Sequence, residues 1–64
     1  MLNQWQHNFL SRLVELGGTI TVPVGVVNDD LVALIEANYV REASGGTSQT
    51  RYEITKAGRA VIQK

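Results

Sequence analysis

The fold is decided near the C-terminus by residues 39–59, YVREASGGTSQTRYEITKAGR. Two runs in this stretch, residues 39–44 and 50–55, contain the valine, isoleucine, threonine and tyrosine residues that are typical of strands. Small and polar residues, 45–49, separate the two runs. The pattern predicts a β-hairpin with a flexible polar tip.

The register of this hairpin follows from the chemistry of its arms. In the simplest alignment Val40 lies opposite Ile54, and Arg41 lies opposite Glu53. The two members of a cross-strand pair share one face of the sheet. We therefore expect the apolar pair to face the core and the charged pair to face solvent.

A short helix, residues 56–63, is predicted directly after the hairpin. Thr55 is a good N-cap, because its hydroxyl can accept a hydrogen bond from a free backbone N–H of the first turn. Gly58 weakens such a helix by about 1 kcal/mol relative to alanine, unless close packing requires a glycine there. The residues expected to pack inward are Ala57, Ala60 and Val61.

The N-terminal segment has the periodicity of an amphipathic helix that ends at Gly17-Gly18. Its large apolar residues recur every three or four positions and are Leu2, Trp5, Phe9, Leu13 and Leu16. Trp5 and Phe9 are expected to anchor the core. The alternative is that these two aromatic residues form a dimer or partner surface.

Between the first helix and the hairpin, the alternation of residues 19–22 predicts a strand that ends at Pro23. Residues 23–27 are either a single helical turn or an irregular link. Asn28 then caps a helix over residues 29–38, and two aspartates favour its N-terminus. The predicted order is helix, strand, helix, strand, strand, helix, in one α+β domain over residues 1–64 with a small antiparallel sheet.

Composition excludes several classes of function. The 64 residues include no cysteine and one histidine, His7, so neither a disulfide nor a thiolate metal site can form. No phosphate-binding glycine loop and no triad of nucleophile, base and acid is present. We therefore expect no enzyme activity, cofactor or metal. Without a signal peptide or an apolar run long enough for a membrane span, a cytoplasmic location is expected.

The formal net charge is zero, but the charge is unevenly distributed. Residues 1–40 carry one basic and four acidic side chains, a balance of −3, whereas residues 41–64 carry five basic and two acidic side chains, a balance of +3. The C-terminal half can therefore form an electropositive surface if its cations converge in space.

Two phrases resemble the winged-helix (winged helix-turn-helix) DNA-binding domains of small bacterial and phage regulators. Residues 34–40, LIEANYV, are similar to the family's passage from recognition helix into wing, and residues 51–59, RYEITKAGR, are similar to the phrase that closes the wing and opens the last helix. The resemblance covers roughly residues 9 to 62 and implies a minimal winged helix. The sequence departs from the family between residues 22 and 28, which are too few for a separate helix and turn.

The resemblance implies a transcriptional regulator that binds double-stranded DNA, with dimerisation expected because a neutral monomer would bind weakly. The helix at 29–38 is acidic and is disfavoured as a groove reader, so the wing and the last helix are expected to contact phosphates. The residues expected to bind nucleic acid are Arg41, Thr47, Ser48, Gln49, Arg51, Lys56 and Arg59. Arg41 could instead pair with Glu53 as an ordinary surface ion pair.

A protein-interaction module is the alternative function, such as a phage-encoded inhibitor or adaptor of a host complex. Its acidic helix would meet a basic surface on a host protein. The residues expected at that interface are Asp29, Asp30, Glu36 and Trp5.

Overall fold

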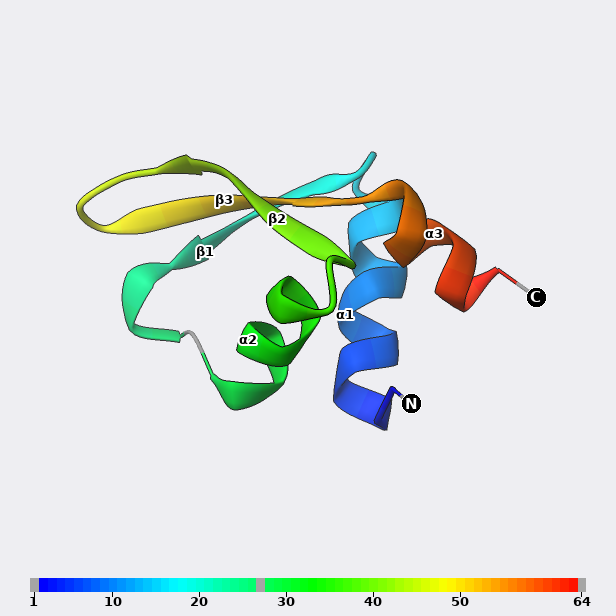
Figure 1. Ribbon diagram of the computed structural model, residues 1–64. Coiled ribbons are helices and arrows are strands. Elements are labelled where there is room, and N and C mark those ends of the chain that lie inside the picture. Colours follow the sequence, from blue (N-terminus) through cyan, green and yellow to red (C-terminus); the bar gives the residue numbers. More distant parts are fainter. Residues whose placement is uncertain (1, 27, 64) are drawn as a thin grey trace.

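The computed structural model describes residues 2–26 and 28–63. In chain order the elements are α1 (Gln4–Glu15), β1 (Thr19–Pro23), the 3-10 turn η1 (Val24–Val26), α2 (Asp29–Glu36), β2 (Val40–Gly45), β3 (Gln49–Ile54) and α3 (Lys56–Ile62). The α+β class and the predicted order of helices and strands are confirmed (Figure 1). The segment after Pro23, whose form the sequence left open, contains one helical turn, while Val27 lies outside the described residues.

Side-chain caps begin all three α-helices. Asn3 and Gln6 form a capping box at α1, in which each side chain bonds the backbone N–H of the other residue. Asn28 accepts a hydrogen bond from the N–H of Leu31 at 2.9 Å, and Thr55 accepts one from the N–H of Gly58 at 3.0 Å. Both caps were predicted from the sequence.

Left-handed residues end α1 and α2. Gly17 has φ 89° and Asn38 has φ 66°. In each case two backbone bonds close the last turn, namely Gly18 N–H to Leu13 O and Gly17 N–H to Val14 O at α1, and Tyr39 N–H to Leu34 O and Asn38 N–H to Ile35 O at α2. This bonding pattern is the Schellman motif, which satisfies carbonyls at a helix end.

The three strands form one antiparallel sheet in the order β1-β3-β2. The predicted hairpin register is confirmed, since Val40 pairs with Ile54 and Arg41 pairs with Glu53. The register shifts between Glu42 and Ser44, so a bulge bends β2 before the tip. β3 is the central strand and pairs with β1 along its other edge.

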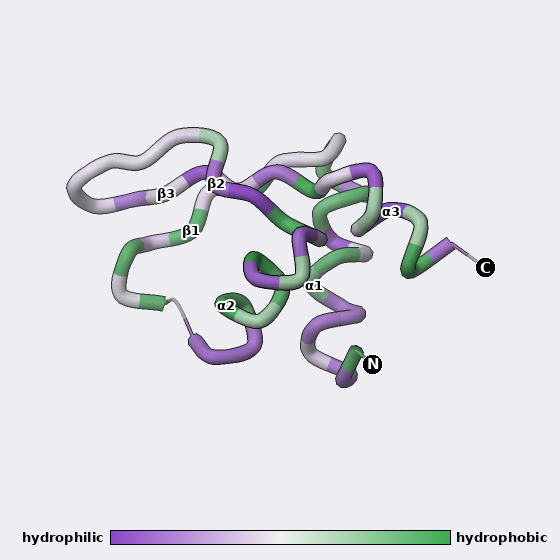
Figure 2. Tube along the Cα trace, viewed as in Figure 1, coloured by the Kyte–Doolittle hydropathy of each residue, from purple (hydrophilic) through white to green (hydrophobic). Residues whose placement is uncertain are grey.

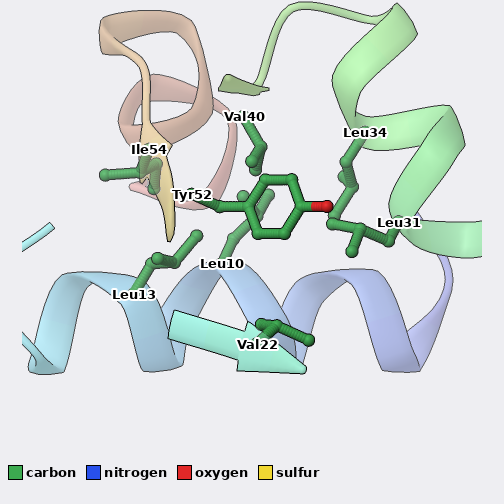
Figure 3. Packing of buried hydrophobic residues seen from close by; sticks show 8 residues of the cluster. All are labelled: Leu10, Leu13, Val22, Leu31, Leu34, Val40, Tyr52 and Ile54. Carbon is green, nitrogen blue, oxygen red and sulfur yellow. The ribbon is translucent and has the colours of Figure 1, made fainter. Parts of the chain in front are cut away.

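The core lies between the inner face of the sheet and helices α1 and α2, while α3 lies at the end of β3 beside α1 (Figure 1). Its buried hydrophobic residues are Leu10, Leu13, Val22, Leu31, Leu34, Val40, Tyr52 and Ile54 (Figure 3). Tyr52 lies at the centre of this cluster, between side chains from α1, α2 and β2. The opposite face of the sheet has no helix over it in the described part of the chain.

The structure corrects the predicted inner face of α1. The buried side chains are Gln6, Leu10 and Leu13, whereas Trp5 is 38% exposed and Leu16 is 48% exposed. Burial of Gln6 is tolerated because its amide is hydrogen-bonded: its Oε1 accepts from the Asn3 N–H, and its Nε2 donates to the Asp30 carbonyl at 3.1 Å. The prediction that Trp5 anchors the core is therefore wrong.

The α3 helix packs through a glycine rather than through alanines. A Cβ on Gly58 would lie 2.2 Å from the Tyr39 carbonyl oxygen, so only glycine allows this approach. Ala57 and Ala60, which were expected to face inward, are exposed, and Val61 is half-buried. Close packing therefore explains the glycine that the helix pattern by itself disfavours.

Candidate nucleic-acid interface

The outer face of the sheet at the hairpin tip carries a cluster of polar side chains around Arg51. On β3, Thr50, Tyr52 and Ile54 are buried, so the alternating residue Arg51 points to the other face. Arg51 pairs with Thr21 of β1 and with Ser44 of β2, and these pairings place both hydroxyls on the face of the guanidinium. Three strands thus contribute to one polar surface.

An open hollow of about 380 Å³ lies on this surface. Its lining residues are Thr21, Ser44, Gly45, Gly46, Thr47, Ser48, Gln49 and Arg51, which include no carboxylate. Gly45 and Gly46 leave the backbone open to close approach, and the hydroxyl and amide groups can donate hydrogen bonds. With an arginine among them, these groups suit the oxygens of a phosphate.

The nearest acidic side chain on β2 belongs to the other face. Glu42 pairs with the buried Tyr52, and Gly45 pairs with the buried Thr50. The Glu42 Oε2 lies 3.1 Å from the position that a Cβ on Gly45 would take, which places this carboxylate on the inner side of the hairpin. The lining residues of the hollow therefore include an arginine and no carboxylate.

Arg41 is held by a carboxylate. Its guanidinium forms an ion pair with Glu53, and the two side chains are 68% and 36% exposed. Among residues 2–26 and 28–63 this is the only ion pair. The alternative that the sequence left open for Arg41, a surface pair with Glu53, is the arrangement that the structure shows.

Lys56 and Arg59 lie at the end of β3 away from the tip. Lys56 is exposed at the start of α3, and Arg59 is half-buried, with its guanidinium against Gly18. From Arg51 to the end of β3 at Ile54 the strand advances by about 10 Å. Arg51, Lys56 and Arg59 are thus spread along the sheet, and of these three Arg51 lines the hollow.

The predicted acidic interface lies on α2, the element that directly precedes the hairpin in the chain. Asp29 and Glu36 are exposed, while Asp30 accepts a hydrogen bond from the Asn3 side chain at 2.8 Å. Exposed valines accompany these acids: Val32 on α2, and Val24 and Val26 on η1, where Figure 2 shows hydrophobic colour along the turn. Trp5, the fourth residue of the predicted interface, lies on α1 and stacks on Phe9.

Comparison with family models, with curated proteins and with solved structures gave no match. Within the described residues, no group of three or more histidine or acidic side chains is placed to hold a metal ion. None of the helices that the structure describes is both long and apolar enough to cross a membrane.

Sequence reasoning missed two side chains of the hollow, those of Thr21 and Ser44. Thr21 belongs to the site only because β1 pairs with the far edge of β3, which the order of elements does not specify. Ser44 lies opposite Arg51 only because of the bulge in β2. A strand-pairing argument that placed β3 at the centre of the sheet could have found Thr21.

Proposed function

We propose that this protein binds double-stranded DNA as a small winged-helix regulator, with the β2–β3 hairpin as its wing. Support comes from the polar hollow at the tip, whose lining residues are Arg51 together with hydroxyl, amide and glycine residues and include no carboxylate. The order of elements and the two sequence phrases are consistent with a winged helix whose second helix is reduced to η1.

In this proposal the hairpin contacts phosphates, and α2 does not enter the major groove. Readers of base edges use arginine, lysine, asparagine and glutamine on the inserted helix. The exposed side chains of α2 include Asp29, Val32 and Glu36, and two of these three would repel phosphates. Binding by phosphate contacts alone is weak and tolerant of sequence.

The test is a titration of fluorescein-labelled duplex DNA followed by anisotropy at low ionic strength. The logarithm of the binding constant should fall linearly with the logarithm of salt concentration, with a slope of about −0.9 for each phosphate contacted. Arg51→Gln should weaken binding and reduce the slope by about one contact. Lys64→Gln is the charge-matched control.

Any of three results would contradict the proposal. The first is no binding of the wild type at low salt. The second is equal affinity and equal slope for Arg51→Gln and for the wild type, because Arg51 is the cation of the hollow. A loss of affinity that is as large for Lys64→Gln as for Arg51→Gln would indicate a response to net charge and would also remove the hairpin from the site.

A protein-interaction module is the second candidate function, and the exposed valines of η1 and α2 favour it. Exposed apolar and acidic side chains on neighbouring elements suit a partner that offers both apolar and basic groups. The variant Asp29→Asn/Asp30→Asn/Glu36→Gln should then recover less of a host partner than the wild type does. Equal recovery of that partner by both proteins would exclude this function.

A further inference from the structure

One side of α1 and its C-cap carries a line of large side chains that the core covers only in part, Trp5, Phe9, Arg12 and Leu16, here termed the α1 line. Trp5 is 38% exposed, Leu16 is 48% exposed, Arg12 is exposed and Phe9 is half-buried. At about 100° of rotation per residue, all four fall within an arc of about 60° on the helix. Phe9 packs partly against the core, whereas Trp5, Arg12 and Leu16 keep solvent-exposed surface.

The α1 line is self-complementary. Successive members are four, three and four positions apart, so the spacing is the same from either end of the line. A two-fold axis across the middle of α1 would therefore place Trp5 against Leu16 of a second copy, and Phe9 against Arg12 of a second copy. Isologous dimers require this property of a surface, because each patch must fit its own image.

The chemistry of the facing pairs is also complementary. Trp5 and Phe9 are stacked, with ring centroids 5.1 Å apart and planes 10° apart, so together they present a flat aromatic surface. Arg12 makes no ion pair within the described residues and can place its guanidinium over the aromatic surface of the other copy. The Leu16 side chain would cover the exposed edge of the opposite indole.

We propose that two copies of this chain pair through antiparallel α1 helices along the α1 line. A formal net charge of zero adds no long-range repulsion between copies. A domain of 64 residues has a small core, and association is a common additional source of stability at this size. The pairing does not depend on the proposed function.

The first test is the solution mass by sedimentation equilibrium, between about 10 µM and about 1 mM of the wild-type chain. The mass should rise from one chain towards two. Trp5→Glu and Leu16→Glu should each weaken dimerisation by at least about tenfold, because a charge would replace an apolar contact. Val26→Glu is the matched control, since Val26 is 58% exposed and lies outside the α1 line.

The single tryptophan gives a second signal, because Trp5 loses water on pairing. Its emission should shift to shorter wavelength as the wild-type concentration rises, in parallel with the mass. A wild type that stays one chain up to about 1 mM would overturn the proposal. So would a Trp5→Glu variant that dimerises like the wild type, or a Val26→Glu control that loses dimerisation equally.

The orientation can be tested separately, because the chain has no cysteine. Trp5→Cys and Leu16→Cys chains are mixed in equal amounts and oxidised. An antiparallel pair brings the two introduced thiols, one from each variant, close together, so mixed disulfides should exceed the random half of the products. A random mixture, or a preference for like-with-like products, would refute the antiparallel register.

Discussion

Gly58→Ala should destabilise the protein, although alanine is the better helix former. Alanine gains about 1 kcal/mol of helix propensity in the interior of a helix. Its Cβ, however, would lie 2.2 Å from the Tyr39 carbonyl oxygen and 2.8 Å from Ile54 Cγ1. A carbon-to-oxygen contact needs about 3.3 Å, so α3 or the Asn38–Tyr39 backbone has to move by about 1 Å.

That movement would disturb two hydrogen bonds at the same place. Thr55 Oγ1 donates to the Asn38 carbonyl at 2.6 Å, and the Thr55 N–H donates to the Tyr39 carbonyl at 3.0 Å. Overpacking costs about 1–3 kcal/mol, and each hydrogen bond contributes about 1 kcal/mol. After the propensity gain, we expect a net loss of about 2–4 kcal/mol, which would lower Tm by at least about 10 °C.

The assay is urea and thermal unfolding followed by far-ultraviolet circular dichroism. Two controls separate packing from propensity. Gly25→Ala places its Cβ where no other atom lies within 4 Å, so its stability should stay within about 0.5 kcal/mol of the wild type. Ala60→Gly, at an exposed position of α3, should cost about 1 kcal/mol. A Gly58→Ala protein as stable as the wild type would refute the close approach of α3 to Tyr39.

Three further predictions concern the parts that position the hairpin. Leu34→Ala removes a fully buried side chain and should cost about 2–5 kcal/mol in urea unfolding, enough to leave little folded protein. Asn28→Ala removes the cap of α2 and should cost about 1 kcal/mol, with a loss of helical signal no larger than that of α2. For Arg41 and Glu53, whose side chains are 68% and 36% exposed, a double-mutant cycle should give a coupling of about 0–1 kcal/mol that decreases with salt.

The hairpin could be predicted because local chemistry determines it. The alternation of apolar and polar residues along both arms admits one register that puts Val40 with Ile54, and a shift by one residue would bury Arg41 or Glu53. The caps at Asn28 and Thr55 were predictable for a similar reason, since each requires only a bond to an N–H three residues ahead.

The sequence could not predict which face of α1 points to the core. Two sets of residues at helical spacing could form that face, and both include Leu13. The more apolar set includes Trp5 and Leu16, and periodicity alone favours that set. In the structure the set that contains Gln6 is buried. The Gln6 amide donates a hydrogen bond to the carbonyl of Asp30, a residue 24 positions away in the sequence. A local pattern does not contain that contact. The same limit applies to the hollow, whose Thr21 depends on a pairing between distant strands.

The sequence phrase that most resembles the winged-helix family has a structural explanation in this protein. Thr55 caps α3 and binds the Asn38 carbonyl, and Gly58 lets α3 lie against the Tyr39 backbone. Thr55 and Gly58 thus allow α3 to pack against the end of α2, and this role does not depend on any ligand of the hairpin. The phrase therefore bears on the fold, and fold alone does not determine function.

The proposal of DNA binding has to stand on the hairpin's outer face instead. There Arg51 is presented from a central strand with hydroxyls on both neighbouring strands, and the nearby Arg41 is already held by Glu53. In the part of the chain that the structure describes, Arg51 is the one cation that lines the hollow and it makes no ion pair. Such a site supports weak phosphate contact, which two linked copies can make effective by binding together. If DNA affinity at low salt rises with the dimer population, the hairpin site and the pairing through α1 belong to one mechanism. If monomeric Trp5→Glu binds DNA as tightly as the wild type does, the hairpin site and the pairing act separately.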